Sequence, residues 1–189
     1  MSLKILAGRY RGRALAAPAG QGALRPTSAR RREAAFDILG AQLGALDGLV
    51  LGDLFAGTGA VGLEALSRGA ARVVFVENDP AAARLIRRNL DALGLAGQAR
   101  VLQNDASRLA TAVEPLDAAF LDPPYGRGLA ERALVRLAAG GWLAPEPVML
   151  VELGRDDAFA APAGFRVARE HPHGAGRLVR LERVEPDPA

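Results

Sequence analysis

From about residue 49 onward, short apolar runs alternate with stretches of helical periodicity, and no other feature constrains the fold as strongly. Five runs have the length and composition of strands: 49–55, 72–77, 100–105, 117–122 and 147–153. Helical stretches follow most of them, at 59–69, 80–95, 106–113 and 129–141. Strands joined by helical crossovers are typical of a parallel sheet that helices cover on both faces.

The end of the chain has a different pattern. Residues 165–171 and 177–184 alternate apolar and polar side chains, and the glycine-containing segment 172–176 joins them. This pattern predicts an antiparallel hairpin at one edge of the sheet. Together the runs predict an α/β, Rossmann-like fold with a mostly parallel sheet of seven strands and an antiparallel C-terminal hairpin.

Positive charge is concentrated at the beginning of the chain. The first 32 residues hold eight basic side chains and no acid, although the net charge of the chain is only +3. We therefore expect a basic arm, residues 1–46, made of a hairpin and a helix over 29–43 that Ser28 caps, followed by a body over 47–189. Such a distribution indicates a polyanionic partner. The candidate RNA contacts are Arg9, Arg11, Arg13, Arg25, Arg30, Arg31 and Arg32.

Arg30, Arg31 and Arg32 fall in the first turn of the expected helix, where the helix dipole disfavours cations. A bound phosphate would relieve that repulsion. The alternative is that all three side chains are solvated.

Composition excludes several classes of site. The chain has no cysteine, so disulfides and thiolate metal sites are excluded, and its two histidines cannot form a multi-histidine centre. We expect no metal. No apolar run reaches the roughly 20 residues of a membrane span, and the N-terminus lacks the pattern of a signal peptide. We therefore expect a cytoplasmic protein, without a membrane partner, that acts as a monomer.

A glycine-rich turn follows the first expected strand. Gly57, Gly59 and Gly62 fit the spacing G-x-G-x-x-G at a strand-to-helix turn, where a nucleotide can approach the backbone. Glu77 ends the next strand, in position to bind ribose hydroxyls. The pattern indicates an adenosine-containing cofactor, and a tight turn without a ligand is the alternative. NAD would fit as well as S-adenosylmethionine.

Two further acids favour S-adenosylmethionine. Asp53 precedes the glycines, where a carboxylate can bind the cationic amino group of the methionine moiety of S-adenosylmethionine. The same carboxylate would lie unfavourably close to the pyrophosphate of NAD. Asp105 follows the third strand, where it can accept a hydrogen bond from the adenine amine. Either acid could instead cap a helix or lie solvated in a loop, and for Asp105 the capping alternative is strong.

The fourth strand ends in the sequence Asp122, Pro123, Pro124, Tyr125. Proline fixes φ and lacks an N–H donor, so this loop is stiff. Asp122 and the Pro123 carbonyl can accept both hydrogens of a primary amine, and Tyr125 can stack on its ring. This arrangement suits methylation of an exocyclic amine on a flipped base by in-line displacement. A turn that merely ends the strand is the alternative.

The segments 4–15, 24–39, 53–70, 74–82, 120–129 and 140–145 together resemble the bacterial 16S ribosomal RNA guanine-N2 methyltransferase family. The resemblance covers nearly the whole chain. It implies a Rossmann-like class I methyltransferase that uses S-adenosylmethionine to methylate the N2 amine of a guanine in 16S ribosomal RNA, free or in a small-subunit particle. The basic arm would help to bind RNA and would cover the cofactor.

The resemblance also assigns residues. The implied cofactor contacts are Asp53, Phe55, Gly57, Gly59, Glu77, Asn78, Asp105, Ala106 and Thr27. The implied catalytic residues are Asp122, Pro123, Pro124 and Tyr125. The chain departs from the family at Gly52, where an aliphatic residue is usual, and in the tail around His171 and His173, where a tyrosine-containing turn is usual. His173 could stack in place of that tyrosine or simply lie in an exposed turn.

Three other functions remain open on the residues alone. An amino-methyltransferase could act on DNA or RNA adenine or on protein glutamine. Aspartate in the proline loop argues against glutamine, and the compact chain argues against sequence-specific DNA modification. An NAD-dependent dehydrogenase lacks an obvious acid–base residue here. A non-catalytic RNA-binding domain would not need both the glycine loop and the proline loop intact.

Overall fold

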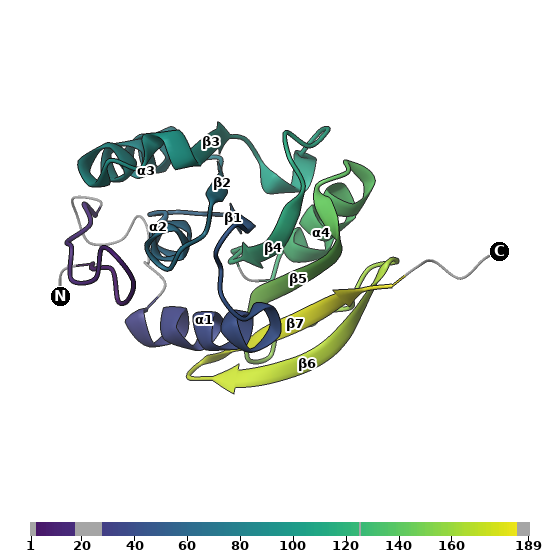
Figure 1. Ribbon diagram of the computed structural model, residues 1–189. Helices are drawn as coiled ribbons and strands as arrows, with labels where there is room; N and C mark the ends of the chain where they lie inside the picture. The colour runs from purple at the N-terminus through teal and green to yellow at the C-terminus, as the bar shows by residue number, and fades with distance from the viewer. Residues whose placement is uncertain (1–2, 18–27, 125, 185–189) are drawn as a thin grey trace.

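Seven strands form one sheet in the computed structural model, which describes residues 3–17, 28–124 and 126–184 (Figure 1). The strands are β1 (Val50–Leu54), β2 (Arg72–Glu77), β3 (Ala99–Gln103), β4 (Leu116–Leu121), β5 (Leu143–Gly154), β6 (Phe165–His173) and β7 (Gly176–Arg183). Their order across the sheet is β3-β2-β1-β4-β5-β7-β6. The strands β1 to β5 are parallel to one another, and β7 pairs antiparallel with both β5 and β6. The predicted α/β fold with a C-terminal hairpin is confirmed.

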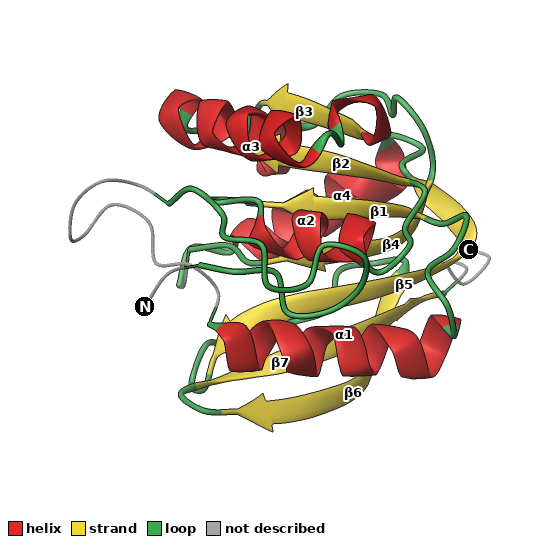
Figure 2. Cartoon of the chain, turned by 60° about the vertical axis from the view of Figure 1, so that its left-hand side comes forward, coloured by secondary structure: helices red, strands yellow, loops and turns green. Residues whose placement is uncertain are grey.

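In the described part of the chain, four helices cover the two faces of this sheet: α1 (Ala29–Leu43), α2 (Ala60–Ser67), α3 (Pro80–Leu93) and α4 (Leu129–Ala139). Helices α1, α2 and α3 lie on one face and α4 lies on the other (Figure 2). Two short 3-10 turns, Ala96–Gln98 and Ala106–Arg108, flank β3. No helix in the described part of the chain is long and apolar enough to cross a bilayer.

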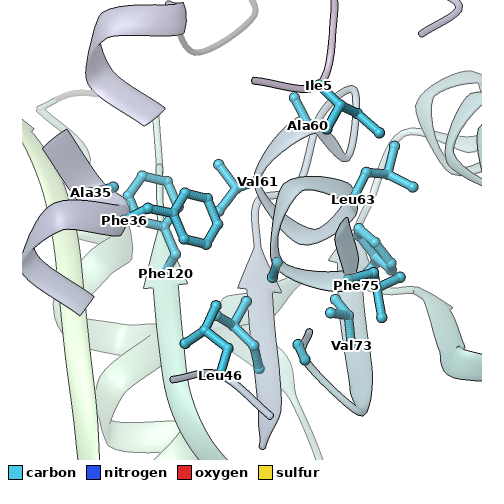
Figure 3. Close-up of a cluster of buried hydrophobic side chains, with 14 of the residues drawn as sticks. Ile5, Ala35, Phe36, Leu46, Ala60, Val61, Leu63, Val73, Phe75 and Phe120 are labelled. Atoms are coloured by element: carbon cyan, nitrogen blue, oxygen red, sulfur yellow. The ribbon is translucent and has the colours of Figure 1, made fainter. Parts of the chain in front are cut away.

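The central strands are buried, and their side chains alternate between two cores. Leu51, Phe75 and Phe120 point to the face of α1, α2 and α3. Their neighbours, such as Leu54 and Leu121, point to the face of α4. Phe36 of α1 and Val61 of α2 lie next to Phe120 in the first core (Figure 3).

The beginning of the chain packs tightly on α2. One β-bridge, Lys4 to Ala14, closes the predicted hairpin, and Ile5 is buried in the first core (Figure 3). Gly8 has φ +79, and a Cβ there would lie only 1.8 Å from the Ser67 carbonyl oxygen. Only glycine therefore permits this approach of the two backbones. The boundary between arm and body at residues 46 and 47 stays a prediction.

The main differences from the expected elements lie at turns. Residues 106–113 form only a 3-10 turn over the first three positions, and the tail hairpin closes through Gly174 and Ala175 because Pro172 and His173 belong to β6. A two-residue turn is the commonest way to join antiparallel strands. At Gly52 a Cβ would lie 2.7 Å from a methyl carbon of Leu116, so Leu116 fills the space of the family's usual aliphatic side chain.

Candidate active site

A cavity of about 1120 Å³ opens where the parallel strands end. Open α/β sheets bind ligands at this edge, because the loops that follow the strands converge there. Most of the predicted cofactor and catalytic residues line it: Asp53, Phe55, Gly57, Glu77, Asn78, Asp105, Ala106, Asp122, Pro123 and Pro124. Gly59 does not line the cavity; it precedes the first residue of α2. Thr27 and Tyr125 lie outside the described residues.

Strand register places four carboxylates along this edge. Asp53 is level with Phe75 and with Phe120. Glu77 and Asp122 each lie two positions beyond those phenylalanines, so the alternation of a strand puts all three acids on the face of α1 and α2. Glu152 lies two positions beyond Leu150, which is level with Phe120. In sheet order the row is Glu77, Asp53, Asp122 and Glu152, and Asp105 follows β3 beyond Glu77.

Glu77 shapes the glycine loop. One carboxylate oxygen accepts a hydrogen bond from the Gly57 N–H at 2.7 Å, and the other accepts from the Asp79 N–H at 2.8 Å. A carboxylate can accept about four hydrogen bonds, so Glu77, which lines the cavity, retains the capacity to accept more. Glu77, a predicted cofactor contact, thus also holds the glycine loop in its conformation.

Asp53 is fully buried beneath the glycine loop and accepts a hydrogen bond from the Gly62 N–H at 2.8 Å. Burial raises the pKa of Asp53 well above its usual value, and the nearby charges of Asp122 and Glu77 raise it further. The Gly62 hydrogen bond acts in the opposite direction. Gly62 permits this contact, since a Cβ there would lie 2.3 Å from the Phe75 ring. A cation bound in the cavity would favour ionised Asp53.

Asp105 both caps a turn and lines the cavity. It precedes the 3-10 turn, and one of its oxygens accepts hydrogen bonds from the Ser107 N–H at 2.8 Å and the Ser107 hydroxyl at 2.7 Å. The hydroxyl hydrogen bond is the first cause that lowers the pKa of Asp105, and Arg108 and Arg132 add to it. The capping alternative therefore describes the local structure correctly, and cofactor binding by Asp105 stays a prediction.

The proline loop begins where β4 leaves the sheet. The Asp122 N–H donates to the Leu54 carbonyl at 3.3 Å, which ties the loop to the end of β1. Pro123 is buried and Pro124 is exposed. The carboxylate of Asp122 therefore lies in the same cavity as Asp53 and Glu77, held by a rigid segment.

Phe55 is held in a conformation that bulky residues avoid. Its φ is +58, the one positive φ of a non-glycine residue in the described part of the chain. Such backbone strain is concentrated at functional sites. Here it lets the chain turn from β1 into the glycine loop while Phe55 lines the cavity.

The predicted RNA-binding arginines differ in their exposure. Arg9, Arg11, Arg13 and Arg30 are exposed, whereas Arg25 lies outside the described residues. Arg32 is only 1% exposed and donates to the Lys4 carbonyl at 2.7 Å. Burial lowers the pKa of Arg32, and the charge of Glu64 acts in the opposite direction. The expectation of a phosphate contact at Arg32 needs correction, because this side chain faces the protein interior. Within the protein, Arg31 pairs with Glu152, and the charge of Glu64 favours the charged form of Arg32.

Sequence reasoning missed Glu152, and it assigned Arg31 only to RNA phosphates. Arg31 forms an ion pair with the buried Glu152 and lines the cavity. A signal for Glu152 was present, since it is an acid near the end of an apolar strand, as Glu77 is.

His173 ends β6 and does not line the cavity. No three acidic or histidine side chains among the described residues lie close enough together to hold a metal ion.

Comparisons with known proteins agree with this geometry. A family model described as "Conserved hypothetical protein 95" matches residues 3–181. The chain is 41% identical over 184 residues to the ribosomal RNA small subunit methyltransferase D of Escherichia coli, covering 95% of this chain and 90% of that protein. It is 34% identical over 177 residues to the protein of the same name from Haemophilus influenzae, covering 91% and 89%.

A solved structure, described as a putative methyltransferase from Escherichia coli, superposes with a TM-score of 0.83 at 36% identity, covering 97% of this chain and 98% of that one. The class I methyltransferase fold and the resemblance carried by the sequence motifs are confirmed. The chain therefore belongs to the family of the "Conserved hypothetical protein 95" model, which is also the family of the ribosomal RNA small subunit methyltransferase D proteins.

Proposed function

We propose that this protein transfers the methyl group of S-adenosylmethionine to the exocyclic N2 amine of a guanine in 16S ribosomal RNA. The observation that carries the proposal is the row of acids at the cavity edge, with Asp122 next to Asp53 in a rigid proline loop. Relatives that cover most of this chain are named for the small-subunit ribosomal RNA.

The residues fit this cofactor by their chemistry. S-adenosylmethionine carries a cationic sulfonium and a cationic amino group, and the buried, desolvated carboxylate of Asp53 favours a cation beside it. Glu77 would hold the ribose hydroxyls, and Asp105 with Asn78 and Ala106 would hold the adenine end. When bound, the cofactor supplies an electrophilic methyl group on sulfur.

Asp122 and the Pro123 carbonyl would act on the target amine. Its lone pair is delocalised into the ring, so it is a poor nucleophile. Two acceptors on its hydrogens favour a pyramidal nitrogen and aim the lone pair at the methyl carbon. The N–C bond forms as the S–C bond breaks, and the acidic ammonium product then loses its proton to Asp122 or to water. Positioning and electrostatic stabilisation supply the rate.

The basic arm would bring the RNA to this site. Arg9, Arg11, Arg13 and Arg30 are exposed and suited to phosphate contacts, and Arg9 lies over the Tyr10 ring at 5.5 Å. A base inside a duplex hides its amine, so the target must lie in a loop or be flipped out. We propose a single copy of the chain as the acting unit.

Methylation in vitro tests the proposal directly. The protein is incubated with labelled S-adenosylmethionine and with either 16S ribosomal RNA or small-subunit particles, and the RNA is digested to nucleosides. We expect label in N2-methylguanosine, and label in N6-methyladenosine or in no nucleoside would contradict the proposal. A thermal-shift comparison of S-adenosylmethionine, S-adenosylhomocysteine and NAD tests the cofactor separately, because a ligand of the folded state stabilises it.

A further inference from the structure

An ion pair lies at the cavity edge next to the catalytic loop. Arg31 of α1 donates through Nη1 to Oε1 of Glu152 in β5. The side chain of Glu152 is 2% exposed, whereas that of Arg31 is 23% exposed and lines the cavity. The buried acid therefore orients the cation, and the cation is the member of the pair that a ligand can reach.

Strand register fixes the position of this pair relative to Asp122. Phe120 in β4 is level with Leu150 in β5, and both strands run in the same direction. Asp122 and Glu152 lie two positions further along, so both side chains project to the face that α1 covers. The sheet order places the proposed cofactor acids Asp53 and Glu77 on one side of Asp122 and Glu152 on the other.

A base with its amine at Asp122 would thus have the cofactor residues on one side and the Arg31–Glu152 pair on the other. We infer that Arg31, oriented by Glu152, donates a hydrogen bond to O6 of the target guanine and makes the site selective for that base. The inference rests on the proposed function. Arg31 would be a specificity-determining residue, and Glu152 would be a positioning residue that acts through it.

The chemistry of guanine suits this arrangement. Its N2 amine and its O6 carbonyl lie at opposite ends of one edge, with N1–H between them. A guanidinium carries five N–H donors, so the pair with Glu152 does not exhaust its capacity. Arginine is the residue that most often reads O6 of guanine. An adenine with its N6 amine at Asp122 would present the C2–H group where guanine has O6, so it would offer Arg31 no acceptor at that position.

An atomic change in the substrate tests this contact. RNA is prepared with the target guanine replaced by 2-aminopurine, which keeps the amine at C2 and lacks O6 together with the N1 hydrogen. Single-turnover methylation is then measured with labelled S-adenosylmethionine on both RNAs. For the wild-type protein we expect guanine to react faster by on the order of tenfold or more, the usual effect of one good base contact.

Two variants remove the contact in different ways. Arg31→Met with Glu152→Leu replaces both members of the ion pair by apolar side chains of similar volume, so neither charge is kept without the other. Glu152→Gln keeps Arg31 but weakens its orientation. We expect the ratio of guanine to 2-aminopurine rates to fall toward the intrinsic ratio of the two bases in the double variant, and to fall less in Glu152→Gln. The two bases differ in intrinsic reactivity, but this difference is the same for every variant. The readout is therefore the change in the ratio of guanine to 2-aminopurine rates between the wild type and a variant.

The matched control is Arg30→Met, an exposed arginine on the same helical turn. It should keep the wild-type ratio even if RNA binding weakens. A double variant that binds S-adenosylhomocysteine normally and keeps the wild-type ratio would overturn the inference alone. If the double variant does not fold, an unchanged ratio in Glu152→Gln has the same meaning. A wild-type protein that methylates no guanine would instead overturn the proposed function, and this inference with it.

Discussion

The carboxylate of Glu77 and the N–H of Gly57 are joined by a hydrogen bond of 2.7 Å, so the end of β2 fixes the conformation of the loop that follows β1. The same carboxylate also accepts from the Asp79 N–H at the start of α3. One side chain thus connects the glycine loop, the second strand and the third helix. A ligand that bridges these elements would meet a site already in shape, which reduces the ordering cost of binding.

We predict that Glu77→Ala weakens binding of S-adenosylhomocysteine by about 1–3 kcal/mol, the usual cost of losing hydrogen bonds to a charged group. Isothermal calorimetry measures the change. Glu146→Ala, which alters an exposed glutamate of β5, is the control and should bind normally. Unchanged affinity in folded Glu77→Ala would remove Glu77 from the cofactor site.

Asp122→Ala should bind the cofactor normally but lose methyl transfer by about 10²–10³-fold, because it removes a contact to the reacting amine. Asp122→Asn keeps an acceptor but loses the charge and should retain partial activity. Single-turnover rates and cofactor affinity, measured on the same preparations, separate the two effects. Near-normal turnover of Asp122→Ala would show that this carboxylate has no part in the chemistry.

Periodicity was sufficient to predict most of the fold. The predicted bounds of α1 and β2 agree with the structure, because Ser28 caps the helix and β2 is a continuous apolar run. The helical stretch predicted over 106–113 is only a 3-10 turn over Ala106–Arg108 in the structure. The Asp105 side chain accepts a hydrogen bond from the N–H of Ser107, and the chain then leaves the helical path. Periodicity does not report such local hydrogen bonds.

The predicted acids of the site could be found because each lies near the C-terminal end of a strand, and parallel strands end at one edge. The role of Arg32 was not predictable, because nothing local distinguishes it from Arg30 and Arg31. Its burial depends on Glu64 and on the Lys4 carbonyl, which are distant in the sequence. Glu152 had a local signal at its strand end, but its pairing with Arg31, 121 positions away, was not predictable.

The stability of the protein should depend on pH through Asp53. Burial raises the pKa of Asp53 in the folded state above its unfolded value of 3.8. The protonated form therefore contributes stability that is fully present below pH 3.8 and is lost as the pH rises through the folded-state pKa. Asp53→Asn cannot ionise and keeps an acceptor for the Gly62 N–H.

Asp53→Asn should accordingly be more stable than the wild type at neutral and alkaline pH, and the difference should shrink as the pH falls. Urea denaturation at several pH values measures it. Asp37→Asn, a change of an exposed acid on α1, is the control and should show no such trend. A stability difference that does not vary with pH would contradict an elevated pKa of Asp53.

Glu64 should be the main attachment of the N-terminal segment to α2. Its buried carboxylate accepts from the Leu6 and Ala7 N–H groups, each at 2.8 Å, and from Arg68 Nε at 3.0 Å. Glu64→Ala removes the buried acceptor of three partly buried donors, so it should lower the free energy of unfolding by about 3–5 kcal/mol. Hydrogen exchange at Leu6 and Ala7 should become faster. The exposed Glu33→Ala is the control, and equal stability of the two variants would contradict the attachment.

Binding of RNA should depend on the exposed arginines of the arm. Replacing Arg9, Arg11 and Arg13 by glutamine should weaken RNA binding and flatten its salt dependence, because each phosphate that is no longer neutralised reduces the log–log slope by about 0.7–0.9. Arg32 is left unchanged because it is buried.

The control replaces three exposed arginines of the C-terminal hairpin by glutamine, which alters the net charge equally: Arg166, Arg169 and Arg183. Filter binding over a salt series should show a smaller slope for the arm variant than for the control. If the two slopes are equal, the arm contributes only general charge, and the phosphates are bound elsewhere.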